Sequence, residues 1–137
     1  MRRDPAAFAL RNVHYRDESL KSLEEADEYG TPLATRAGRD AFASYLRDTL
    51  DPFAMRRWGE ELRARRARGD AFPVPLALVY STEDPMVPPR MGDLLSELIP
   101  SAELVWMKDS SHFAHVDSPD AFVAIAEAFF DRVAPGR

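Results

Sequence analysis

The stretch VPLALVYSTEDPMVP, residues 74–88, decides the fold of this chain. Residues 75–80 are a short continuous apolar run, which is typical of a strand buried on both faces of a parallel sheet. A polar turn follows, in which Asp84 stands directly before Pro85. The stretch therefore predicts an α/β fold in which a polar loop leaves the end of a buried strand.

A helix is predicted directly after Pro88 and Pro89, and Pro100 ends it. Its apolar residues recur at helical spacing and are Met91, Leu94, Leu95 and Leu98. Residues 103–107 follow as a second strand. A strand, a helix and a strand in this order are expected to give two parallel neighbours joined by a right-handed crossover.

A last helix is predicted to begin at Ser118-Pro119-Asp120. Ser118 supplies a capping hydroxyl, Pro119 suits the first helical position, and Asp120 lies at the positive end of the helix dipole. The residues that this helix is expected to bury are Phe122, Ile125, Ala126, Phe129 and Val133. Residues 71–137 therefore have the order strand, helix, strand, helix.

Residues 1–70 are polar, charged and helical in pattern, and the chain divides near residues 71–75. Helices are predicted at 17–29, 39–50 and 53–68. We expect Ser19 to cap the first of them, the sequence Gly-Thr-Pro at 30–32 to end it, and Gly69 to end the third. The apolar stripes of these helices are too modest to form a core, so the segment is expected to lie on a larger body.

Two loops are expected to carry the chemistry, because catalytic groups gather beyond the carboxyl ends of parallel strands. Residues 81–88 contain Asp84, and residues 108–115 contain His112. Adjacent strands lie about 5 Å apart, so these two side chains can meet. A carboxylate that orients an imidazole base is half of a nucleophilic triad, and acid before histidine is the order of an α/β-hydrolase.

The chain resembles the C-terminal half of the α/β-hydrolase family, with two parallel strands and flanking helices preceded by helical cap segments. Four stretches carry the resemblance to the penultimate strand, the approach to the last strand, the histidine loop and the final helix: 74–88, 99–105, 110–113 and 117–122. The resemblance implies that Asp84 is the triad acid and His112 the triad histidine.

The same resemblance divides the chain into a cap portion, residues 1–70, and a core portion, residues 71–137. Residues 5–55 are similar to the end of the helical cap in epoxide hydrolases and C–C bond hydrolases. Ser111 departs from the family, which usually has glycine directly before the histidine. We expect Ser111 to shift the loop slightly and to leave the histidine in place.

Other polar residues near the two loops have plainer interpretations. Glu83 is a less favoured partner of the histidine, and Asp109 is interpreted as a turn residue. A zinc site made of His112, His115 and Asp117 has no further His or Cys to support it, and Asp117 is expected at the N-terminal end of the last helix. The remaining candidates are interpreted as packing residues: His14, Tyr15, Tyr29 and Tyr45.

The sequence contains no Gly-x-Ser-x-Gly or Gly-x-Asp-x-Gly elbow, the motif that carries the nucleophile in the family. We therefore expect a hydrolase of an ester, an epoxide or a C–C bond, present as an N-terminally truncated chain that is inactive alone. The alternatives are half of a two-chain enzyme, completed by an N-terminal half, and a non-catalytic remnant that binds a partner. The expected substrate is a small molecule, and no metal or organic cofactor is expected.

The composition argues against several other classes of protein. Lys and Arg number 18 against 23 Asp and Glu, so the formal net charge is −5 and nucleic-acid binding is not expected. The absence of cysteine excludes disulfides, thiolate metal sites and a cysteine nucleophile. No apolar run approaches the roughly 20 residues of a membrane span, so we expect a cytoplasmic protein with no membrane partner.

Overall fold

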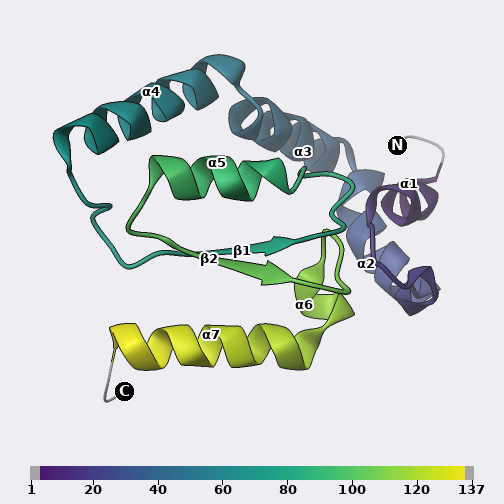
Figure 1. The fold of residues 1–137 in the computed structure, drawn as a ribbon. Coiled ribbons are helices and arrows are strands. Elements are labelled where there is room, and N and C mark those ends of the chain that lie inside the picture. Colours follow the sequence, from purple (N-terminus) through teal and green to yellow (C-terminus); the bar gives the residue numbers. More distant parts are fainter. Residues whose placement is uncertain (1–3, 135–137) are drawn as a thin grey trace.

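The computed structural model describes residues 4–134 and combines helices with one small sheet (Figure 1). The elements in chain order are α1 (Pro5–Asn12), the 3-10 turn η1 (Glu18–Leu20), α2 (Leu23–Ala34), α3 (Arg36–Thr49), α4 (Pro52–Arg68), β1 (Ala77–Ser81), α5 (Arg90–Leu98), β2 (Glu103–Met107), α6 (Ala114–Asp117) and α7 (Pro119–Val133). The predicted α/β class is confirmed, and so is the alternation of strand and helix in the second half.

Strands β1 and β2 pair in parallel, with Ala77 opposite Glu103 and Ser81 opposite Met107. Helix α5 connects them on one side of the sheet, and α7 lies on the other side (Figure 1). Because the strands are parallel and in register, the loops that follow Ser81 and Met107 leave the sheet at the same edge. The two polar loops of the sequence are thereby placed next to each other.

Helix α5 approaches the sheet closely through Gly92. A Cβ atom at this position would lie 2.9 Å from Cγ of Tyr80 and 3.1 Å from Cη2 of Trp106. These two aromatic rings stand on neighbouring strands with their centroids 6.0 Å apart. The absence of a side chain at Gly92 therefore lets the helix rest directly on the aromatic pair.

Replacing Gly92 with alanine is expected to lower the free energy of unfolding by about 1–3 kcal/mol, because the added methyl group overpacks this contact. Urea denaturation followed by circular dichroism measures the change. The matched control is Gly59→Ala in α4, where the new Cβ would meet only Nη1 of Arg63, at 3.4 Å. That variant is expected to gain about 0.5–1 kcal/mol, since alanine favours a helix interior. Equal stability of the two variants would contradict the close packing of α5.

The sheet and α7 are less buried than predicted. Within the strands only Ser81 and Met107 are buried, and the apolar residues between their ends are partly exposed. On α7, Val133 is 36% exposed, and the other residues of the predicted stripe are only partly covered: Phe122, Ile125, Ala126 and Phe129. The predicted stripe is only partly buried because two strands present too narrow a surface to cover a 15-residue helix.

The first predicted helix has different ends in the structure. Ser22 rather than Ser19 caps α2, since its Oγ accepts a hydrogen bond from the Glu25 N–H at 3.0 Å. The residues around Ser19 form the separate turn η1, which Asp17 caps. Helix α2 also continues through Pro32 to Ala34, so the prediction that residues 30–32 end it is wrong.

Packing against α1, a helix that no sequence pattern predicted, accounts for the longer α2. A Cβ at Gly30 would lie 2.8 Å from the backbone nitrogen of Ala6 and 2.8 Å from the carbonyl carbon of Pro5. Glycine therefore lets the two helix backbones approach each other. The close packing of the two helices outweighs the helix-breaking tendency of Gly-Thr-Pro, since tertiary structure commonly overrides local propensity.

The next two helices follow the prediction more closely. Helix α3 begins three residues earlier than expected, because Thr35 caps it by accepting a hydrogen bond from the Gly38 N–H at 3.0 Å. Helix α4 begins after Asp51, whose carboxylate accepts from the Phe53 N–H at 2.8 Å. It ends as predicted at Gly69, which adopts φ of 73°. Within residues 4–134, no helix combines the length and apolar character that crossing a bilayer requires.

Candidate active site

Asp84 and His112 meet at the edge of the sheet where both strands end. Oδ2 of Asp84 lies 2.9 Å from Nδ1 of His112, a hydrogen-bonding distance. The Asp84 side chain is 9% exposed and that of His112 is 31% exposed. The structure thus brings together the two residues that the sequence singled out, one from each loop.

The other oxygen of Asp84 organises its own loop. Oδ1 accepts hydrogen bonds from the backbone N–H groups of Met86 at 2.7 Å and Val87 at 2.9 Å. Asp84 is therefore both a turn-forming residue and the partner of His112, because its two oxygens face different ways. The turn fixes the carboxylate, and the fixed carboxylate can hold the imidazole ring.

The Asp84 carboxyl is held in its charged form. Burial by itself raises the pKa of Asp84, and this is the largest single effect. The hydrogen bonds from Val87, His112 and Met86 together outweigh burial and lower the pKa of Asp84 below its ordinary value of 3.8. An ionised carboxylate accepts the Nδ1–H of His112, which leaves Nε2 as the basic nitrogen of the neutral ring.

Two hydrogen bonds of Ser111 hold the histidine loop against other parts of the chain. The Ser111 N–H donates to Oδ2 of Asp117 at 2.6 Å, and its hydroxyl donates to the carbonyl oxygen of His14 at 2.6 Å. Ser111 therefore uses its side chain to join the loop to a segment 97 positions away. His112 contacts Asp84 although serine replaces the usual glycine before it, so the histidine is in its expected place.

Two expectations about this loop are wrong. Asp117 is the last residue of α6 and binds the Ser111 N–H, instead of lying at the start of α7. Ser118 makes no side-chain capping bond to α7. Its hydroxyl instead accepts a hydrogen bond from Oγ of the buried Ser110 at 3.1 Å and donates one to the carbonyl oxygen of Asp109 at 3.4 Å.

Glu83 and Asp109 both point to Arg16 and not to His112. Nε of Arg16 lies 3.3 Å from Oε2 of Glu83, and its Nη1 donates to Oδ1 of Asp109 at 2.6 Å. Asp109 has φ of 57°, in agreement with its interpretation as a turn residue. No sequence motif marked Arg16, and its contacts with Glu83 and Asp109 are seen only in the folded chain.

Aromatic packing supports the histidine from the side of the N-terminal segment. Phe113 contacts His112 edge-on and Tyr15 edge-on, with centroids 5.3 Å apart in each pair. Tyr15 is buried, its hydroxyl donates to Glu25, and burial together with this contact raises its pKa. Among the three tyrosines interpreted as packing residues, Tyr15 agrees with the interpretation, whereas Tyr29 and Tyr45 are exposed.

A hollow of about 340 Å³ adjoins the Asp84–His112 pair. Its lining comes from the backbone and side chains of β1 together with Asp84, Val87, His112 and Ala114. Within the described residues β1 pairs with β2 alone, so the hollow follows the unpaired edge of β1. The side of the site next to the histidine is therefore open.

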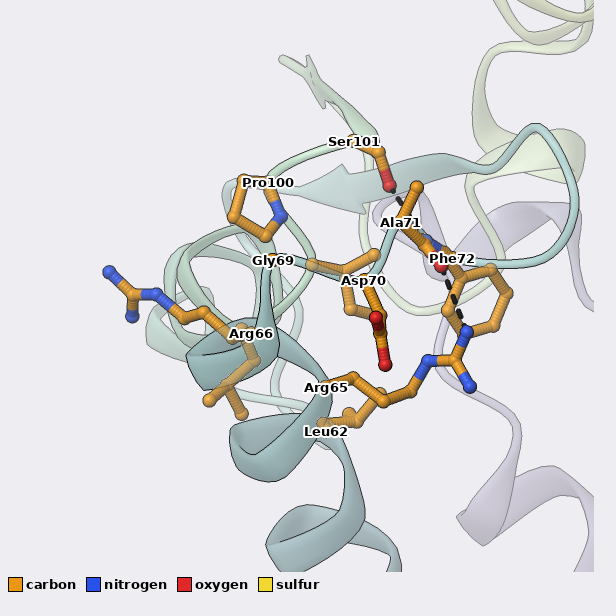
Figure 2. Close-up of a pocket in the computed structure, with 11 residues that line it drawn as sticks. Leu62, Arg65, Arg66, Gly69, Asp70, Ala71, Phe72, Pro100 and Ser101 are labelled. Atoms are coloured by element: carbon orange, nitrogen blue, oxygen red, sulfur yellow. Dashed lines mark hydrogen bonds between the residues drawn. The ribbon is translucent and has the colours of Figure 1, made fainter.

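A second hollow, of about 350 Å³, lies at the opposite end of the strands (Figure 2). It separates the end of α4 from the turn that precedes β2. Figure 2 shows the hydrogen bonds that join these segments: Nη2 of Arg65 donates to the Ala71 carbonyl at 2.9 Å, and the Phe72 N–H donates to Oγ of Ser101 at 3.3 Å. No acid–histidine pair faces it, and ligands gather at the other end of parallel strands.

The residues considered for zinc do not converge on one point. His112 contacts Asp84, His115 lies edge-on to Phe122 with ring centroids 6.1 Å apart, and Asp117 binds backbone N–H groups. Within residues 4–134, no group of three or more His, Asp or Glu side chains is arranged to hold a metal ion.

Comparison with known proteins agrees with the fold. A sequence model described as the alpha/beta hydrolase family matches residues 2–125. The pimeloyl-[acyl-carrier protein] methyl ester esterase of Neisseria meningitidis serogroup A is 33% identical over 64 residues, which are 47% of this chain and 20% of that protein. The same enzyme from a serogroup B strain is 32% identical over 62 residues, or 45% of this chain and 24% of that protein. The chain thus spans about a quarter or less of the length of these esterases, and it belongs to the alpha/beta hydrolase family.

Proposed function

We propose that this chain supplies the acid and the base of a nucleophile–histidine–aspartate triad that hydrolyses an ester. The 2.9 Å contact between Asp84 and His112, at the carboxyl ends of two neighbouring parallel strands, carries the proposal. An ester is favoured over an epoxide or a C–C bond because the relatives are named as methyl ester esterases. Residues 1–70 would form part of the cap over a small-molecule substrate.

The proposed chemistry follows from the two ring nitrogens of His112. Asp84 accepts the Nδ1 proton and fixes the tautomer, so that Nε2 is free to take the proton of a nucleophilic hydroxyl. That hydroxyl oxygen bonds to the ester carbonyl carbon. The bond between this carbon and the alkoxy oxygen then breaks, and His112 gives the proton to the leaving alcohol. A water molecule then attacks the same carbon with His112 again as the base, which releases the acid and restores the hydroxyl. Asp84 stabilises the imidazolium in both steps. We place the reaction in the cytoplasm, because a chain without cysteine suits a reducing compartment.

The nucleophile would come from a segment outside these 137 residues, since they contain no elbow motif. The unpaired edge of β1 is the surface on which such a segment would continue the sheet. There it would lie beside the hollow that His112 also lines. An N-terminal half of the protein is the proposed occupant.

The test is an assay of the chain joined to the coding sequence found upstream of its first codon in the same frame. Hydrolysis of p-nitrophenyl butyrate is expected, and His112→Ala should lower kcat about a million-fold because the general base is lost. The matched control is His115→Ala, which removes an exposed ring outside the pair and should change kcat little. Full activity in His112→Ala would refute the proposal.

A partner-binding module without catalysis is the second candidate, and the open edge of β1 is the observation that favours it. This candidate predicts a complex of fixed stoichiometry in size-exclusion chromatography with light scattering. A stop codon close upstream, with no nucleophile-bearing partner encoded nearby, would favour it. An upstream frame that encodes a Gly-x-Ser-x-Gly elbow would exclude it.

A further inference from the structure

Arg16 connects the loop of the acid with the loop of the histidine. Its Nε lies 3.3 Å from Oε2 of Glu83, the residue directly before Asp84. Its Nη1 lies 2.6 Å from Oδ1 of Asp109, three residues before His112. A single planar guanidinium thus contacts both loops at once, which its fork of N–H donors allows.

The backbone of the same residue is fixed to the histidine loop by Asp117. Oδ1 of Asp117 accepts from the Arg16 N–H at 2.8 Å, while Oδ2 accepts from the Ser111 N–H at 2.6 Å. The hydroxyl of Ser111 adds a bond to the carbonyl oxygen of His14 at 2.6 Å. Residues 14–16 are therefore held against the residue that immediately precedes His112.

The loop that receives these contacts contains one residue with positive φ. Asp109 adopts φ of 57°, a left-handed conformation that a residue with a side chain adopts at a cost. Its carboxylate is the group that Nη1 of Arg16 holds. Loss of the arginine would remove the contact that opposes relaxation of this loop.

The contacts of Arg16 are suited to positioning more than to overall stability. Its side chain is 43% exposed, and those of Glu83 and Asp109 are 53% and 73% exposed. Solvent screens ion pairs of this kind, so each adds little to the free energy of unfolding. Small displacements of a catalytic pair nevertheless have large effects on rate.

We propose that Arg16 is a positioning residue that fixes the Asp84 loop relative to the His112 loop. The inference rests on the proposed function for the catalytic role of Asp84 and His112. The contact between these two residues is itself present in this chain, so the effect of Arg16 on it can be measured directly. Arg16 touches no reacting atom. Its side chain acts through Glu83 on one side and Asp109 on the other, while its backbone N–H binds Asp117.

The test uses the full chain with ¹⁵N-labelled histidine and follows exchange of the His112 Nδ1–H proton with water by NMR. Arg16→Ala is expected to speed this exchange about tenfold, because the two loops are then held together less firmly and the proton is exposed more often. Compared with Arg16→Ala, Arg16→Lys should restore only part of the protection from exchange, because one ammonium group cannot bind both Glu83 and Asp109 as the guanidinium does. The control is Arg36→Ala, which breaks an exposed ion pair with Asp40 on α3.

A second variant keeps the test decisive if Arg16→Ala folds poorly. Asp109→Asn retains the side-chain shape and the tolerance for positive φ but loses the charge that Arg16 binds. It should speed exchange in the same direction, and 0.5 M NaCl should do so in the wild-type chain by screening the ion pairs. Unchanged exchange in both Arg16→Ala and Asp109→Asn would overturn the positioning role.

Activity of the completed enzyme separates this inference from the proposed function. Arg16→Ala is expected to lower kcat about 10- to 100-fold with little change in KM, as for a misplaced catalytic group. If Asp84→Asn leaves the rate intact while Arg16→Ala still speeds exchange, the proposed function fails and the positioning role stands. If Asp84→Asn abolishes activity while Arg16→Ala changes neither kcat nor exchange, the positioning role fails alone.

Discussion

Replacing Asp84 with asparagine is expected to lower kcat of the completed enzyme about 10,000-fold, with a small change in KM. The asparagine carbonyl can still accept the N–H bonds of Met86 and Val87, so the turn persists. Its NH₂ group then faces Nδ1 of His112 and donates to it. This favours the tautomer with the proton on Nε2, and the ring can no longer accept the proton of the nucleophile. Initial rates on p-nitrophenyl butyrate measure the effect.

Asp93→Asn is the matched control for this prediction, because it makes the same chemical change at an exposed position on α5. It should leave kcat close to the wild-type value. A loss of less than about tenfold in Asp84→Asn would be inconsistent with an orienting role, since one wrong tautomer costs far more than that.

Acid denaturation of the chain itself gives a second readout of the same variant. The folded-state pKa of Asp84 is lowered below 3.8, so its charged form contributes stability that is fully present above pH 3.8. That contribution is lost as the pH falls through the lower pKa of the folded state. Asp84→Asn should therefore flatten the dependence of the unfolding free energy on pH in this acidic range.

Replacing Tyr15 with alanine is expected to lower the free energy of unfolding by about 3–4 kcal/mol. Tyr15 is 3% exposed and packs edge-on against Phe113, so truncation leaves a cavity between the N-terminal segment and the histidine loop. The same change leaves Glu25 without the hydroxyl that donates to it. Urea denaturation followed by circular dichroism is the measurement.

Two further tyrosine variants serve as controls for this prediction. Tyr15→Phe keeps the ring and removes only the hydrogen bond to Glu25, so a loss of about 0.5–1.5 kcal/mol is expected. Tyr45→Ala removes a ring that is 61% exposed on α3 and should change stability by at most about 0.5 kcal/mol. Equal losses in Tyr15→Ala and Tyr45→Ala would show that Tyr15 does not join the two parts of the chain.

The candidate site could be predicted where its signal is local in sequence. Asp84 stands before a proline at the end of an apolar run, and His112 stands in the loop after the next strand, so parallel pairing was enough to bring them together. Arg16 and Tyr15 could not be found in this way. Their partners lie about 100 positions along the chain, and no spacing rule connects residues so far apart.

The sequence by itself determined the strands, the helix between them, the end of α4 at Gly69 and the acid–histidine pair. These features depend on hydrophobic periodicity, turn chemistry and the pairing of neighbouring segments, which act over a few residues. Only the tertiary structure decided that α2 continues past Pro32, because Gly30 lets α1 pack against it. It also decided that Ser111, Asp117 and Arg16 hold the histidine loop, because those bonds form between segments that meet only when the chain is folded.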